Sequence, residues 1–178
     1  MSRMQASRSF RTVVLLALAL VLAACGFHLR ENARLPASMQ RVHVTVNGNS
    51  TLQRHLARAL QTSGATVEDA GGPGIAELQV PVAAFSSDTV TAGGYSRISE
   101  FAVRYQVQFQ VTDVGGRILV PHQQIDMSRE YSYDATNTVG NASQVQEIQR
   151  SLNDDMVQAI LFRLQAAGKH PQAAAAQP

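Results

Sequence analysis

Residues 101–112 alternate between two kinds of side chain without an exception, and this run constrains the fold more than any other. One set of positions is apolar or aromatic: Phe101, Val103, Tyr105, Val107, Phe109 and Val111. The other set is small or polar: Ala102, Arg104, Gln106, Gln108, Gln110 and Thr112. Successive side chains of a strand point to opposite faces, so the run predicts a long strand with one face on a core. The other face meets water or a polar partner.

Shorter patterns predict the remaining elements. Apolar alternation predicts strands over 42–46 and 78–82 and from Ile118 to Tyr133, with Pro81 at an edge or bulge and a break at Pro121. Helical spacing predicts a helix from Ser50, ended by Gly64, and a second one from Ser143 to Leu164, after a loop over 137–141. Gln53 and Gln146 would complete capping boxes with the two serines.

The predicted order is β-α-β-β-β-α, an α+β fold in the form of a two-layer sandwich. Two amphipathic helices would pack on one face of a roughly four-stranded, mostly antiparallel or mixed sheet. The opposite face would carry Arg104, Gln106, Gln108 and Gln110, free to bind a partner. We predict this domain over 41–165.

The first 24 residues differ from the rest of the chain. Arg3, Arg8 and Arg11 precede an apolar run from Val13 to Leu22, which is too short to cross a bilayer and is typical of a secretory signal peptide. They belong to the 15 Lys and Arg, whereas none of the 13 Asp and Glu precedes residue 25. The remaining chain therefore carries 12 basic against 13 acidic residues, which removes the support for a nucleic-acid-binding protein.

The only cysteine follows this leader directly. Leu22-Ala23-Ala24-Cys25 resembles the lipobox of bacterial lipoproteins. The resemblance predicts cleavage after residue 24 and an N-palmitoyl, S-diacylglycerol cysteine at Cys25, with acyl chains enough for stable anchoring. Gly26 after the cysteine favours the outer membrane. Residues 25–40 would form the lipid-anchored connector, and residues 166–178, rich in Ala, Gln and Pro, a disordered tail.

The search for catalytic groups favours a binding protein. The five histidines are scattered without metal-ligand spacing, and no nucleophile motif or phosphate-binding loop occurs, so we predict no enzyme, no metal and no cofactor. Arg97, in a glycine-rich loop, is a candidate contact for a phosphate or carboxylate. Tyr131 and Tyr133, beside Arg129, are either interface anchors or part of the core.

The mature N-terminus carries a more specific signal. Cys25-Gly26-Phe27-His28-Leu29-Arg30 resembles the mature start of the LptE family, also called rare lipoprotein B. The segment Leu35–Met39, the order of elements and the long last helix are similar to that family too. The resemblance covers residues 1 to about 165.

Membership of that family implies a non-enzymatic partner of the outer-membrane β-barrel LptD, lying in its lumen and assisting its assembly. It also implies binding of lipopolysaccharide (LPS) on its way to the outer leaflet. Arg97 matches the first of the family's two basic contacts. The second has no match, since residues 134–149 hold no Lys or Arg, and Arg104, Arg129 or Arg150 would replace it.

Two alternatives remain open from the sequence. One is a lipid-anchored envelope protein that binds another partner through the same sheet face. The other is a lipid-anchored envelope hydrolase, which would need a nucleophile and a base that the motifs do not supply.

Overall fold

The computed structural model describes residues 35–91, 98–134 and 136–169. In chain order, these residues form η1 (Ala37–Met39), β1 (Arg41–Val46), α2 (Ser50–Thr62), β2 (Thr66–Glu68), β3 (Ala76–Thr91), β4 (Ile98–Thr112), β5 (Ile118–Asp134) and α3 (Thr138–Lys169). The leader, Cys25 and Arg97 lie outside the described residues, as do most of the connector and residues 170–178. The helix α3 includes the first residues of the segment predicted to be a tail.

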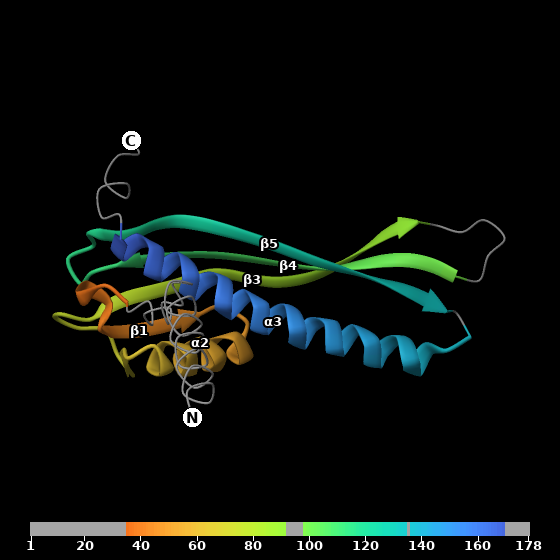
Figure 1. The fold of residues 1–178 in the computed structure, drawn as a ribbon, viewed down its shortest axis with the longest axis horizontal. Helices are drawn as coiled ribbons and strands as arrows, with labels where there is room; N and C mark the ends of the chain where they lie inside the picture. Colours follow the sequence, from red (N-terminus) through yellow and green to blue (C-terminus); the bar gives the residue numbers. More distant parts are fainter. Residues whose placement is uncertain (1–34, 92–97, 135, 170–178) are drawn as a thin grey trace, which may run out of the picture. The chain divides into compact units, whose positions relative to one another are not determined.

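The sheet is mixed and has five strands in the order β2-β1-β3-β4-β5 (Figure 1). The strand β1 pairs in parallel with both β2 and β3, whereas β4 pairs antiparallel with β3 and β5. The α+β sandwich is therefore confirmed. The fifth strand is β2, around Thr66 and Val67, which is too short to show a period in the sequence.

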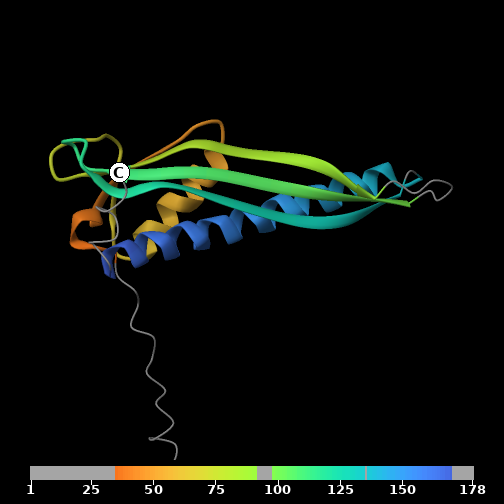
Figure 2. The same ribbon diagram turned by 90° about the horizontal axis from the view of Figure 1, so that it is seen from above.

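Both helices cover the same face of the sheet, as the alternation in β4 predicts (Figure 2). The core between the layers holds Leu52, Leu56 and Leu60 of α2 and a stripe of α3 that includes Leu152, Met156, Ile160 and Leu164. The odd-numbered residues from Val103 to Val111 in β4 lie beneath them, each at most 1% exposed. Burial of this apolar area is the main source of stability in the fold.

The helix caps differ from the predicted ones. Asn49, not Ser50, caps α2, because its side chain accepts a hydrogen bond from the backbone N–H of Leu52 at 2.9 Å. Gln53 does not complete a capping box; its amide nitrogen donates to the carbonyl oxygen of Val44. Gly64 ends α2 as predicted, with a φ of 90° that favours glycine.

The last helix begins before the predicted Ser143. Asn137 provides the cap: its side-chain oxygen accepts from the backbone N–H of Gly140 at 3.0 Å. Most of the loop predicted over 137–141 is therefore helical, and the predicted capping box of Ser143 and Gln146 is wrong. The hydroxyl of Ser143 donates instead to the carbonyl of Val139. An asparagine caps as well as a serine does, so composition does not separate the two positions.

Pro81 marks a bulge, and there the predicted face of β3 changes. The register shifts between Gln79 and Val82, and β1 pairs with β3 only as far as Val80. One extra residue inverts the alternation. Val82, predicted to share a face with Val80, therefore pairs with Gln108 on the polar side, and Phe85 pairs with Tyr105 on the helix side.

A second irregularity lies in β5. The register against β4 shifts between Val120 and Gln123, around Pro121, but the strand is not broken there as predicted. The missing N–H of the proline is accommodated by the bulge.

The sheet has two parts, which Figure 1 shows along its length. We call the five-stranded part covered by both helices the base. We call the three-stranded part from the register-mates Ser86, Arg104 and Ser128 onward, with residues 138–149 of α3, the extension. Only α3 contributes a helix to the described part of the extension.

Candidate functional site

The face of the sheet opposite the helices is open and polar. Even-numbered residues of β4 point to this side, and neighbouring strands add side chains of the same kind. We call the set the polar face: Gln79, Asp88, Arg104, Gln106, Gln108, Gln110, Gln124 and Asp126. Ala102 lies on this side too and is 3% exposed, since it is flanked by Asp88 and Glu130 in register.

The side chains of the polar face bind one another across the strands. Gln110 donates to Gln79 at 3.0 Å, and Gln108 donates to Gln124 at 3.3 Å. Gln124 in turn donates to Asp126 at 2.8 Å, and the guanidinium of Arg104 forms an ion pair with Asp88. A surface of this kind keeps its order in water and presents hydrogen-bonding groups with little net charge.

Tyr131 and Tyr133 lie on the helix side, not on the polar face. Both pack against Phe101, with ring centroids 5.9 Å and 5.5 Å apart. Both side chains are partly buried. They are therefore members of an aromatic cluster in the extension, and their role at an interface stays a prediction.

The candidate arginines are not gathered on one side. Arg104 belongs to the polar face, whereas Arg129 and Arg150 belong to the helix side. Each is paired with an acid: Arg129 with Asp155 at 2.7 Å, and Arg150 with Glu147 at 2.7 Å. The structure thus does not bring these three described arginines together into one anion site.

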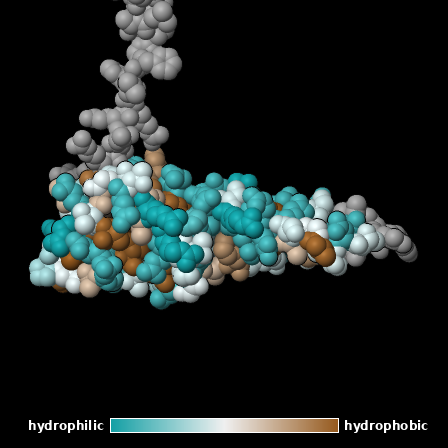
Figure 3. All heavy atoms as spheres, turned by 90° about the horizontal axis from the view of Figure 1, so that it is seen from below, coloured by the Kyte–Doolittle hydropathy of each residue, from teal (hydrophilic) through white to brown (hydrophobic). Residues whose placement is uncertain are grey.

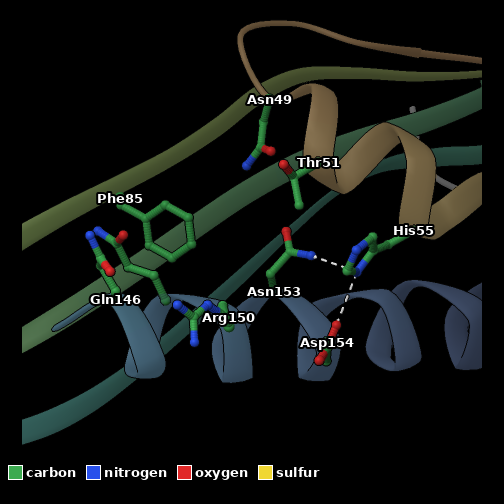
Figure 4. A pocket seen from close by; sticks show the side chains of 9 residues that line it. Asn49, Thr51, His55, Phe85, Gln146, Arg150, Asn153 and Asp154 are labelled. Carbon is green, nitrogen blue, oxygen red and sulfur yellow. Dashed lines mark hydrogen bonds and ion pairs between the residues drawn. The ribbon is translucent and has the colours of Figure 1, made fainter. Parts of the chain in front are cut away.

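A pocket of about 360 Å³ lies where the base meets the extension (Figure 4). The start of α2, the middle of α3 and β3 enclose it. Its lining consists of Asn49, Thr51, His55, Phe85, Gln146, Gln149, Arg150, Asn153 and Asp154. Sequence reasoning missed this site. The available signal is Asn153, a polar residue between the apolar stripe positions Leu152 and Met156.

Asn153 is a buried polar residue of this pocket. It is 4% exposed, and its side-chain oxygen has no hydrogen-bond partner. Its amide nitrogen lies 3.2 Å from Nδ1 of His55, which also lies 3.0 Å from a carboxylate oxygen of Asp154. A ring nitrogen cannot accept from one and donate to the other at once, so the tautomer of His55 decides which contact forms.

Tyr105 lies beneath the pocket and ties the start of α2 to the sheet. The side-chain nitrogen of Asn49 donates to its hydroxyl oxygen at 3.0 Å. Burial raises the pKa of Tyr105 well above its ordinary value, and the hydrogen bond from Asn49 offsets only part of this effect. The phenyl ring of Phe85 stacks on Tyr105 with centroids 3.9 Å apart.

Within residues 35–91, 98–134 and 136–169, no three His, Cys, Asp or Glu side chains are close enough together to hold a metal ion. None of the helices in these ranges has a run long and apolar enough to span a bilayer. The fold and its surfaces define a class of protein: a two-layer α+β domain with one helix-covered face and one open polar face.

Comparisons with known proteins identify the family to which this domain belongs. A model of the family described as LptE, Lipopolysaccharide-assembly, matches residues 39–164. The chain belongs to this LptE family, and the resemblance seen in the sequence is confirmed. A relative from Photorhabdus laumondii, the LPS-assembly lipoprotein LptE, is 26% identical over 140 residues, which are 75% of this chain and 77% of the relative.

Solved structures show the same fold. An uncharacterized lipoprotein B from Nitrosomonas europaea matches with a TM-score of 0.68 and 24% identity, over 83% of this chain and 97% of that one. The rare lipoprotein B from Shewanella oneidensis matches with a TM-score of 0.64 and 14% identity, over 74% of this chain and 98% of that one. At these identities the likeness concerns the fold alone.

Proposed function

We propose that this protein is a non-enzymatic outer-membrane lipoprotein that associates with the LptD β-barrel and binds LPS during its transport to the outer leaflet. Cys25 would carry the acyl chains that anchor it, and the domain would face the periplasm and enter the barrel lumen. Membership of the LptE family supports the LPS-assembly role. The open polar face is the structural observation that carries the proposed barrel association.

The physical match is between this face and the inside of a membrane barrel. The lumen of an outer-membrane barrel is polar and wet, whereas its outer surface is apolar. On this sheet face, Arg104 is paired with Asp88 and the Asp126 carboxylate accepts from Gln124, and the glutamines can exchange their hydrogen bonds with such a wall. The helix-covered side already packs on the core of the domain.

Barrel association is tested by substitution on the polar face. Arg104→Ala, and separately Gln108→Ala, should lower the amount of LptD recovered with the protein from detergent extracts. Arg54→Ala is the matched control, because Arg54 is exposed on α2, on the other side of the sheet. Equal recovery with all three variants, or recovery of a partner that is not a large barrel, would contradict the proposal.

LPS binding is tested at Arg97, with Arg117→Ala as the control because Arg117 is exposed in the turn between β4 and β5. Arg97→Ala should weaken LPS binding, and the loss should shrink at high salt because exposed charge pairs are screened. Binding that responds equally to Arg97→Ala and Arg117→Ala, or to neither, would remove Arg97 from the site.

A further inference from the structure

The pocket at the junction of base and extension has no part in barrel association as proposed above. Its lining comes from the two helices and from Phe85 on the helix side of β3 (Figure 4). The register places the polar face on the other side of the sheet. We propose that it binds a neutral saccharide, with a sugar hydroxyl on the buried amide of Asn153 and an apolar sugar face on the ring of Phe85.

The side-chain amide of Asn153 lacks one hydrogen-bond partner, and a ligand hydroxyl would supply it. The amide nitrogen faces His55, and the buried oxygen has no hydrogen-bond partner. If the amide is turned over, the oxygen accepts from a protonated Nδ1 of His55 and the nitrogen is left without a partner. A hydroxyl both donates and accepts, so it satisfies Asn153 in either orientation. Leaving such a buried group unmet is costly.

Phe85 supplies an apolar surface of the right kind. One face of its ring is stacked on Tyr105, at an interplanar angle of 9°, and the side chain also lines the pocket. The C–H groups on one face of a pyranose ring pack against aromatic rings, whereas its hydroxyls point outward around the edge. The pocket combines a ring of this type with surrounding hydrogen-bonding groups.

The rest of the lining favours a neutral ligand. Gln146 and Gln149 place carboxamides at the pocket, and each can donate and accept, as neighbouring sugar hydroxyls do. Two polar side chains of the lining already have partners within the chain: Arg150 pairs with Glu147, and Nδ1 of His55 lies 3.0 Å from a carboxylate oxygen of Asp154. The charge of Arg150 is already partly balanced by Glu147, which lowers its attraction for an anion.

The size is consistent with a small ligand. A volume of about 360 Å³ lies at the lower end of the range for ligand pockets, roughly 300–1,000 Å³. Such a pocket admits one or two sugar rings and leaves no room for a folded partner domain.

The test is an NMR titration of the full chain in a zwitterionic detergent that has no sugar headgroup. The probes are glucose, galactose, mannose, N-acetylglucosamine and maltose. At least one should shift the side-chain amide signal of Asn153 and those of Gln146 and Gln149 in a saturable way. If none of them shifts these signals, the pocket holds only water and the proposal is overturned.

Two variants separate binding from folding. Asn153→Leu removes the unmet group at nearly constant shape, so the free energy of unfolding should stay level or rise while sugar binding weakens about tenfold or more. Phe85→Ala should weaken sugar binding too, whereas Phe162→Ala, which removes an exposed aromatic ring elsewhere on α3, should not. Unchanged binding in both pocket variants would overturn the assignment.

A second arm separates two sources of the sugar. Maltose and dodecyl maltoside share a headgroup, and the latter presents it on mixed micelles. Equal affinities support a free sugar, and at least tenfold tighter binding of the micellar headgroup supports a glycolipid. Because Arg104→Ala leaves this pocket intact, its sugar binding should be unchanged, so a failure of barrel association and a failure of sugar binding are distinguishable.

Discussion

The base and the extension are built from the same strands, yet they reach stability in different ways. In the base, two helices cover the sheet, and large apolar side chains such as Leu56 and Phe109 are fully buried. In the described part of the extension, one helix covers three strands, and the buried apolar residues are Ala102 and Val103. Its larger side chains, such as Phe101 and Tyr131, are only partly buried.

The surface reflects this difference. Figure 3 shows mostly hydrophilic residues over the narrower end of the described domain and a larger share of hydrophobic ones over the wider end. Where the sheet extends beyond α2, it gains surface area for contacts but buries fewer apolar side chains. The base is therefore expected to carry the stability, and the extension to offer surface.

The largest expected effect tests this division directly. Leu56→Ala, in the base, should lower the free energy of unfolding by about 2–5 kcal/mol, because it leaves a cavity in a closed core. Phe101→Ala, in the extension, should cost clearly less although it removes more atoms, because its side chain is already partly in water. Urea unfolding of both variants measures the difference. Equal losses would mean that the extension has a core as complete as the base.

The two helix caps give a matched pair. Asn137→Ala, at the start of α3 in the extension, should cost about 1 kcal/mol, the usual value for a cap. Asn49→Ala, in the base, should cost more, since it also removes the hydrogen bond to the buried hydroxyl of Tyr105. Thermal unfolding should therefore show a larger loss of stability for Asn49→Ala than for Asn137→Ala. The reverse order would show that α3 depends on its first turn more than the comparison allows.

Alkaline pH sharpens the comparison at Tyr105. Its pKa is raised in the folded protein, so the folded state holds the proton more tightly than the unfolded state, where the pKa is about 10. The contribution of the neutral phenol is therefore complete below pH 10 and is lost as the pH rises beyond it. Absorbance at 295 nm, with Tyr105→Phe as the reference, should show no ionisation of Tyr105 near pH 10 until the protein unfolds. Ordinary titration would mean that water reaches the base.

The smallest effect is expected at the surface ion pairs. Arg129→Ala, in the extension, and Arg41→Ala, in the base, should each change the free energy of unfolding by less than about 1 kcal/mol, since both pairs lie at the surface in contact with water. A much larger loss for Arg129→Ala would mean that its pair with Asp155 holds α3 on the extension.

The sequence predicts the fold wherever a period runs long enough. The alternation of β4 over 101–112 gives the strand, its two faces and the open polar side, and Gly64 gives the end of α2. Three residues are too few for a period, so β2 is not predicted as a strand. The predicted caps lie one residue from Asn49 and several from Asn137, because Asn, Ser and Thr are all favoured at the start of a helix.

The candidate site divides in the same way. Arg104 and the three glutamines of β4 follow from alternation alone and lie together on the polar face. The pocket needs contacts between Asn49, Phe85 and Asn153, which are far apart in the chain, and no local pattern encodes them. The side of the sheet to which Phe85 points depends on the bulge at Pro81. The proline marks the position of this bulge in the sequence, but the sequence does not show that the alternation is inverted beyond it.

Because the bulge at Pro81 resets the alternation, β3 works as two strands joined out of phase. Its first half pairs with β1 and packs on the core beneath α2. Its second half, from Val82 onward, follows the shifted register, which decides the side of the sheet to which each residue points. If β3 instead kept the register of its first half past Pro81, Phe85 would pair with Arg104 on the wet side and Ala84 with Tyr105, so the stacked ring would be lost without any change to the ring itself. The register shift at this proline thus determines the pocket floor as much as the identity of the residues that form it.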